Sequence, residues 1–188
     1  PNIDRIYQNG ISFHSTYTNG SLGGALSMPS RAMIMTGRGV FQIVKDGQVI
    51  PEQHVTLPEL LRQHGYITFK QPFFAYVAFT SPHDPRLKHP DYGKHYEADT
   101  ITLPINFLPR HPFDTGDMNV RDEILRPVPR TEEAIKKEIA DYYGMISEVD
   151  TQIGRVLQAL QESGQLDNTI LVFASDNGLA VGQHGLLG

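Results

Sequence analysis

The sequence predicts an α/β fold in which helices flank a mostly parallel sheet. Two apolar runs, at 73–80 and 169–175, have the nearly continuous hydrophobicity of strands that are buried on both faces. The second run follows a long stretch, 131–163, in which apolar residues recur at helical spacing. A helix followed by a buried strand is typical of a parallel sheet covered by helices.

The composition narrows the class of protein. The chain has 188 residues, of which 39% are hydrophobic and 20% charged, as in ordinary globular domains. No apolar run is long enough to cross a bilayer, so no membrane span is expected. The net charge of -5, without a basic cluster, argues against nucleic acid as a partner. Because the sequence contains no cysteine, it has no disulfide, thiolate metal site or cysteine nucleophile.

The remaining elements are predicted from residues that start or stop helices. The stretch 81–130 is rich in proline, histidine and charge, and it shows no clear element, which in a compact domain usually means that it covers a site. The other expected elements are a helix at 3–9 capped by Asn2, a strand at 11–18, a helix that begins near Pro29 and ends at Gly37, a helix from Leu57 to Gly65 with Thr56 and Glu59 as capping box, and the helix at 131–163, which could break at Gly144 and ends at Gly164.

Both predicted buried strands lead directly into polar motifs, SPHDP and SDNG. Ligands of open parallel sheets bind beyond the carboxyl ends of the strands. Asp176 and Asn177 offer adjacent oxygen atoms, the ligands that Ca²⁺ and Mg²⁺ prefer. Asp-Asn-Gly is also a common tight turn, and without further information the turn is the favoured interpretation.

Two histidines are candidates for the site. His83 in SPHDP could bind an anion, act as a general acid, or simply be solvated. His184 in GQHG is a candidate only because it is near Asp176 in sequence. The other histidines, His111 among them, are expected to be surface or packing residues.

Ser27 lies where a helix is expected to begin. A hydroxyl at that position faces free backbone amides and the positive end of the helix dipole, and Arg31 follows one turn later on the same face. Such a pocket would hold a tetrahedral anion. An ordinary serine N-cap explains the same spacing and is the simpler interpretation.

A family resemblance decides between these interpretations. The run SMPSR at 27–31, followed by TGR at 36–38, resembles the sulfatase signature, in which Cys or Ser precedes x-P-S-R and a later T-G-R. PNIDRIYQNGISF, PFFAYVAFTSPHDP and FASDNGLAVGQHGLLG also resemble sulfatase segments, so the similarity covers most of the chain and is weakest at 86–130. The resemblance implies an alkaline-phosphatase-like sulfatase fold and an enzyme that releases inorganic sulfate from a sulfate ester such as a sulfated carbohydrate.

The resemblance also implies a set of residue roles. In this family the Cys or Ser of the signature is oxidised to formylglycine, and a serine is typical of bacterial enzymes that a radical sulfatase-maturing enzyme processes. A periplasmic or secreted location follows by the same resemblance. The implied catalytic residues are Ser27, Arg31 and His83, the substrate-binding residues His83 and His184, and the metal ligands Asp176 and Asn177, which would bind calcium in preference to magnesium.

Some features of the family are absent from this sequence. They are an aspartate pair on an N-terminal strand, a G-K-W-H-like segment, and a Lys soon after the position of Gly188. We therefore expect 1–188 to be part of a single catalytic domain, with segments missing before residue 1, near 69–71 and after 188. Two alternatives stay open: a phosphoester or phosphonate hydrolase of the same superfamily, and an inactive relative that binds sulfated glycans.

Overall fold

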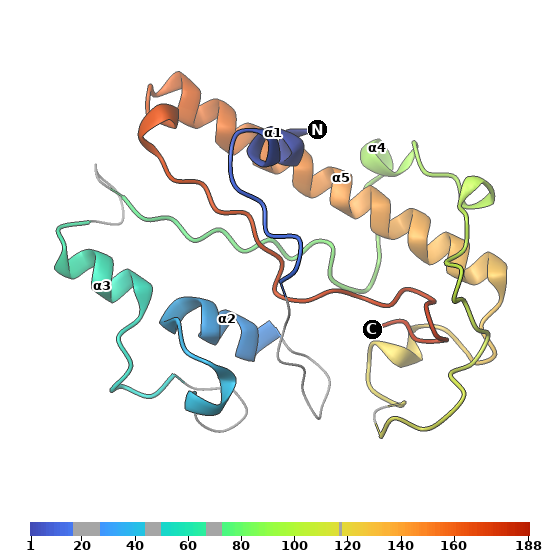
Figure 1. Ribbon diagram of the computed structural model, residues 1–188. Coiled ribbons are helices and arrows are strands. Elements are labelled where there is room, and N and C mark those ends of the chain that lie inside the picture. The colour runs from blue at the N-terminus through green and yellow to red at the C-terminus, as the bar shows by residue number, and fades with distance from the viewer. Residues whose placement is uncertain (17–26, 44–49, 67–72, 117) are drawn as a thin grey trace. The chain divides into compact units, whose positions relative to one another are not determined.

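The computed structural model describes residues 1–16, 27–43, 50–66, 73–116 and 118–188 (Figure 1). Contacts divide the chain into two compact units. Unit 1 is Pro1–His14, Phe79–Ala174 and Leu179–Gly188, and unit 2 is Ser15–Ala78 and Ser175–Gly178. The expectation of one catalytic domain concerns a longer protein and stays a prediction, and the expected gap near 69–71 lies outside the described residues.

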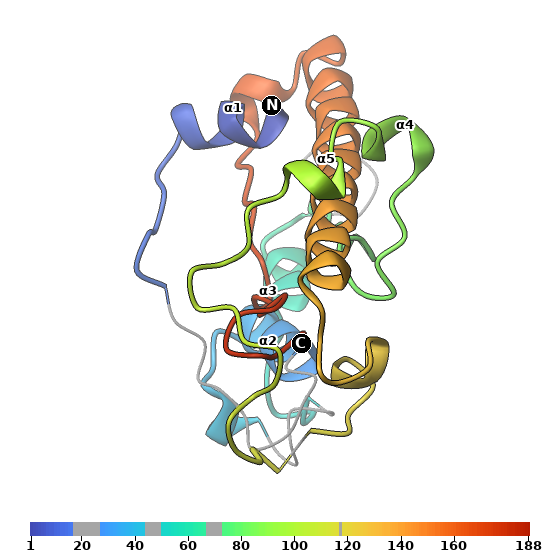
Figure 2. The same cartoon turned by 90° about the vertical axis from the view of Figure 1, so that its right-hand side faces the viewer.

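Helix α5, Glu132–Glu162, is the main element of unit 1 (Figures 1 and 2). Its N-cap is Thr131, whose hydroxyl accepts a hydrogen bond from the Ala134 amide at 3.2 Å. The helix continues through Gly144, which is buried on its inner face, so the break considered there does not occur. Gly164, with a φ of 69°, ends it as expected.

The inner face of α5 builds two apolar clusters within unit 1. The first surrounds Ile135 and Ile139, against which Val181 and Leu187 pack from the C-terminal segment. The second contains Val149, Ile153 and Leu157, with Ile3 and Ile6 of α1 and with Leu166 and Leu171 packed against it. The helical spacing seen in the sequence therefore marks the buried side of α5 in part: Ile135, Ile139, Val149 and Ile153 are buried, whereas Val156 is 42% exposed.

Helix α1, Asn2–Gln8, lies beside α5 (Figure 2). Asn2 was expected to cap this helix, but it is the first helical residue and its side chain donates instead to Asp150 Oδ2 at 3.0 Å. The backbone amides of Asn2 and Ile3 donate to the same carboxylate, at 3.0 and 2.8 Å. Burial raises the pKa of Asp150, but these hydrogen bonds outweigh it and lower the pKa below its ordinary value.

The stretch 81–130, for which no element was predicted, contains short helices. Its first part, which holds Pro90–Gly93 and Ala98–Thr100, packs against α5, and Tyr96 Oη lies 2.9 Å from Ser147 Oγ of that helix. The short helices of unit 1 are α4 (Pro90–Gly93), η2 (Ala98–Thr100), η3 (Glu123–Leu125) and η4 (Leu166–Asn168).

Unit 2 contains α2 (Ser27–Thr36), η1 (Val40–Gln42) and α3 (Leu57–Gln63). Gly37 and Gly65, with φ of 64° and 87°, follow α2 and α3 as the sequence predicts. Glu59 accepts hydrogen bonds from the Thr56 amide and hydroxyl at 2.8 and 2.9 Å, and these bonds lower the pKa of Glu59.

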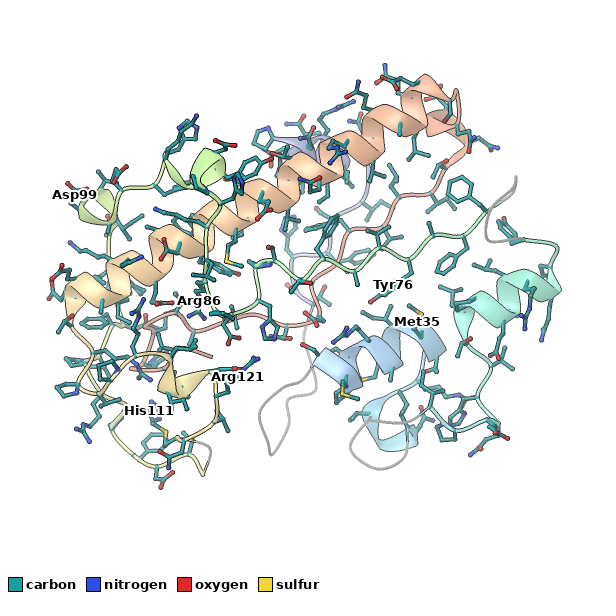
Figure 3. All side chains as sticks on the ribbon, turned by 180° about the vertical axis from the view of Figure 1, so that it is seen from behind. Met35, Tyr76, Arg86, Asp99, His111 and Arg121 are labelled. Carbon is teal, nitrogen blue, oxygen red and sulfur yellow. The ribbon has the colours of Figure 1, made fainter. Side chains whose placement is uncertain are left out.

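The described residues contain no strand, and the pairing seen among them is a single antiparallel bridge between Phe107 and Gln183. The runs 73–80 and 169–175 are extended, but they are not buried as expected. In the second run Ile170 is 93% and Val172 85% exposed. In the first run Tyr76, labelled in Figure 3, is also exposed. A strand is buried only when neighbouring strands and covering helices are in place. The parallel sheet therefore stays a prediction. Residues 11–16 of the strand expected at 11–18 do not form a strand either, and the last two residues of that stretch lie outside the described ranges.

Candidate functional site

Unit 2 brings together residues that lie about 150 positions apart in sequence. Ser27 Oγ donates a hydrogen bond to Asn177 Oδ1 at 3.3 Å. One turn into α2, the buried Ser30 hydroxyl donates to the Asp176 carbonyl at 2.8 Å. The first turn of α2 is thereby attached to the SDNG motif, and Ser27 faces the side chain that was predicted as a metal ligand.

Arg31 lies over the same turn. Its Nε donates to the Ser27 carbonyl at 3.1 Å, and the side chain is exposed. A cation at a helix N-terminus is unfavourable for the helix itself, because the dipole is positive there. The position of Arg31 therefore favours a role in binding an anion over a role in helix stability.

Asp176 and Asn177 offer the oxygen atoms that a hard divalent cation prefers. Asp176 Oδ1 accepts from the Asn177 amide at 3.1 Å, and Asn177 Nδ2 donates to the Gly178 carbonyl at 2.9 Å, which leaves Asn177 Oδ1 turned toward Ser27. Among the described residues there is no group of three or more acidic or histidine side chains that could hold a metal ion. The two residues fit calcium or magnesium in chemistry, but they supply only part of a shell of about six to eight oxygens.

His83, in unit 1, follows the extended run after Thr80 and is about half exposed. Its Nδ1 donates to the Asp84 carbonyl at 2.9 Å and lies equally close, at 2.9 Å, to Asp84 Oδ1. Its Nε2 lies 3.5 Å from Nη2 of Arg121. The histidine is thus oriented by polar partners on both sides and is not a freely solvated loop residue.

His184, also in unit 1, is exposed but firmly oriented. Asn106 Nδ2 donates to His184 Nε2 at 2.9 Å, and the His184 backbone is bonded to Asn106 O and His111 Nδ1 at 2.8 and 2.7 Å. The φ of His184 is 54°, a left-handed conformation that few residues other than glycine adopt. Local strain of this kind is common at functional sites.

The C-terminal segment of unit 1 is held by a buried charged pair. Arg130 Nη2 donates to Glu123 Oε2 at 2.7 Å, and Glu123 Oε1 accepts from the amides of Leu187 and Gly188 at 2.9 Å each. Arg130 Nη1 also donates to the Gly185 carbonyl. Charged side chains therefore fix the backbone on the C-terminal side of His184.

Comparison with known proteins identifies the family of the chain. The family model described as Sulfatase matches residues 68–188. The chain belongs to the sulfatase family. The matched residues include the SPHDP and SDNG motifs, whereas Ser27 and Arg31 precede them.

Curated relatives of this sulfatase chain agree with the match. It is 33% identical over 114 residues to the arylsulfatase of Clostridium perfringens, an alignment that covers 61% of this chain and 24% of that protein. It is 32% identical over 151 residues to the iduronate 2-sulfatase of Mus musculus, covering 72% and 27%. It is 31% identical over 134 residues to a multifunctional alkaline phosphatase superfamily protein of Trinickia caryophylli, covering 63% and 26%. The chain spans about a quarter of the length of these relatives, and no solved structure matches it.

The sulfatase family implies an alkaline-phosphatase-like α/β fold.

Several residues around the sulfatase motifs were not singled out from the sequence. Asp84 stands within SPHDP, where it could have been suspected as a partner of its neighbouring histidine. Arg121 and Asn106 come from the stretch 81–130, which gave no signal beyond its polar composition. His111 was expected to be a surface or packing residue, yet it bonds the backbone of His184.

None of the described helices combines the length and apolar character that a membrane-crossing helix requires.

Proposed function

We propose that the protein hydrolyses sulfate esters to inorganic sulfate, with Ser27 as the precursor of its nucleophile. The observation that supports this most is the hydrogen bond from Ser27 Oγ to Asn177 Oδ1, which joins the signature serine to the SDNG motif. Membership of the sulfatase family gives the reaction class.

The proposal includes oxidation of Ser27 to formylglycine by a sulfatase-maturing enzyme. An unmodified serine that attacked sulfur would leave a stable sulfate ester on the protein. Hydrated formylglycine would supply one hydroxyl to attack sulfur and a second hydroxyl whose deprotonation expels sulfate, so that water need not attack sulfur. Asn177 Oδ1 would orient the attacking oxygen, as it orients Ser27 Oγ here.

The remaining residues are proposed to stabilise charge on the sulfuryl group. Arg31 would neutralise one oxygen from the first turn of α2. A divalent cation bound by Asp176 and Asn177, calcium in preference to magnesium, would withdraw charge from the others. On the family resemblance alone, His83 would bind sulfate or protonate the leaving alcohol, and His184 would contact the substrate.

We further propose a sulfated carbohydrate as the substrate. Iduronate is a sugar acid, so the name of the mouse relative, iduronate 2-sulfatase, supports this class. A periplasmic or secreted location is proposed with it, because sulfated polysaccharides are extracellular.

The direct test is sulfate release from an aryl sulfate by the whole, matured protein. We expect Ser27→Ala to abolish release, because the variant cannot form the aldehyde. Ser163→Ala is the matched control and should keep full activity, because it removes an exposed hydroxyl that, among the described residues, bonds only the Leu160 carbonyl of α5. Equal activity of Ser27→Ala and the parent protein would rule out the proposal.

A second candidate is a phosphoester or phosphonate hydrolase, favoured by the similarity to the multifunctional alkaline phosphatase superfamily protein. Matched aryl phosphate and aryl sulfate esters separate the two activities. Faster release of phosphate, lost in Ser27→Ala, would support this alternative. An inactive glycan-binding relative would release neither product.

A further inference from the structure

Three side chains of unit 1 meet at one carboxylate oxygen. Asp84 Oδ1 lies 2.9 Å from His83 Nδ1 and 3.0 Å from Arg121 Nη2. The same Arg121 nitrogen lies 3.5 Å from His83 Nε2, although the two residues are 38 positions apart in sequence. The Asp84 carboxylate therefore holds a histidine and a guanidinium next to each other.

These contacts fix the tautomer of His83. Its Nδ1 faces both the carbonyl oxygen and Oδ1 of Asp84, and these oxygens can only accept, so Nδ1 carries the hydrogen. In the neutral ring Nε2 is then the unprotonated nitrogen. Arg121 can only donate, and it faces that nitrogen, which is consistent with the assignment.

The Asp84 carboxylate is buried, whereas the two side chains that it orients are exposed. The Asp84 side chain is 5% exposed, whereas His83 is 48% and Arg121 63% exposed. Arg121 uses Nε and Nη2 for Asp122 and Asp84, and within the described part of the chain its Nη1 makes no hydrogen bond. The hydrogen bond to Asp122 and the charge of Asp84 raise the pKa of Arg121, so the guanidinium stays cationic.

The arrangement is costly if its only purpose is stability. Asp84 Oδ2 is buried, and no described residue hydrogen-bonds it. A buried carboxylate oxygen without a partner destabilises a fold. A buried anchor that carries an unpaired oxygen, and that orients two exposed polar groups, points to ligand binding.

We propose that Asp84 is a positioning residue that presents His83 Nε2 and the Arg121 guanidinium to one sulfate group of the substrate. The inference rests on the proposed function for the identity of the anion. Arg121 Nη1 donates to a sulfate oxygen, and the protonated ring donates from Nε2 to another. Asp84 balances the charge of both donors, so that they can lie this close together.

The first experiment measures binding of inorganic sulfate to the whole protein by NMR, with the side-chain nitrogens of His83 as reporter. In the sulfate-free neutral ring we expect hydrogen on Nδ1. Arg121→Gln should weaken sulfate binding about tenfold, the loss expected for one charge-assisted hydrogen bond at an exposed site. Arg155→Gln, which removes an exposed arginine of α5, is the matched control and should bind as the parent does.

A pair of substitutions at Asp84 separates positioning from general structural damage. Asp84→Ala leaves the backbone carbonyl of residue 84 as the acceptor for His83 Nδ1, so the Nδ1–H tautomer should be less populated than in the parent and sulfate binding should be weak. Asp84→Asn keeps an acceptor oxygen and should restore the Nδ1–H tautomer. If Asp84→Ala does not fold, Asp84→Asn and Arg121→Gln still decide the question.

Hydrogen on Nε2 instead of Nδ1 in the sulfate-free neutral ring, or equal sulfate affinity in Arg121→Gln and the parent, would overturn the inference. Sulfate binding requires neither formylglycine nor turnover. A protein that binds sulfate as described but hydrolyses no ester would refute the proposed function and leave the positioning role standing. Hydrolysis with unchanged sulfate binding in Arg121→Gln would refute only the positioning role.

Discussion

Replacement of Glu123 by alanine should destabilise unit 1 strongly, because it leaves a buried cation without its anion. The side chain of Glu123 is 8% exposed and that of Arg130 is 1% exposed. The carboxylate accepts from Arg130 at 2.7 Å and from the amides of Leu187 and Gly188 at 2.9 Å. Breaking a buried pair by removing one partner costs about 3–5 kcal/mol.

The other contacts of Glu123 and Arg130 narrow this range of destabilisation. Two backbone amides also lose their acceptor, which adds to the loss, but Arg130 keeps its bonds to the carbonyls of Gly185 and Glu123, which limits it. We therefore expect a decrease of about 4 kcal/mol in the free energy of unfolding, a large part of the roughly 5–15 kcal/mol that stabilises a typical domain.

Urea denaturation of the whole protein measures this loss as a shift in midpoint. Glu133→Ala is the control, because Glu133 is exposed in the first turn of α5 and contributes at most about 1 kcal/mol through the helix dipole. Hydrogen exchange at the Leu187 and Gly188 amides should also accelerate in Glu123→Ala. A loss below about 1 kcal/mol in Glu123→Ala would show that this pair does not hold the segment.

Three further predictions concern other contacts. The pKa of Asp150 is lowered in the folded protein. Its stabilising contribution is therefore complete above the ordinary aspartate pKa of about 3.9 and is lost as the pH falls below that value. In Asp150→Asn the free energy of unfolding should depend less on pH in that acidic range. Gly182→Ala should cost about 2–4 kcal/mol in urea denaturation, because φ is 97° and the added Cβ would lie 2.5 Å from Ile135 Cγ2. Ser30→Ala should cost about 1 kcal/mol and slow sulfate release, because the bond that attaches Asp176 to α2 is lost; unchanged rates would argue against that attachment.

The helices could be predicted from the sequence because their signals are local. Thr131, Gly37, Gly65 and Gly164 each mark a helix end through their own conformation or a hydrogen bond within one turn. Asn2 shows the limit of such signals, because its side chain bonds a residue 148 positions away instead of capping its own helix. The apolar runs also carry no information on which strands lie beside them, so the sheet could not be derived from them alone.

The candidate site was predictable in part, and mainly through family resemblance. Spacing alone favoured a turn at Asp176 and an ordinary cap at Ser27, and it gave no reason to connect the two. Their contact depends on the path of the chain over 150 residues. Arg121 and Asn106 lie in irregular segments without periodicity, where only tertiary structure shows that each lies next to a histidine.

The proposed hydrolysis requires the conversion of Ser27 to formylglycine, and mass spectrometry of the peptide that contains Ser27 tests this conversion most directly. In protein that releases sulfate, we expect a fraction of this peptide to be lighter than the serine form by two hydrogen atoms and to react with a carbonyl reagent. An unmodified serine or a phosphoserine in fully active protein would contradict the account.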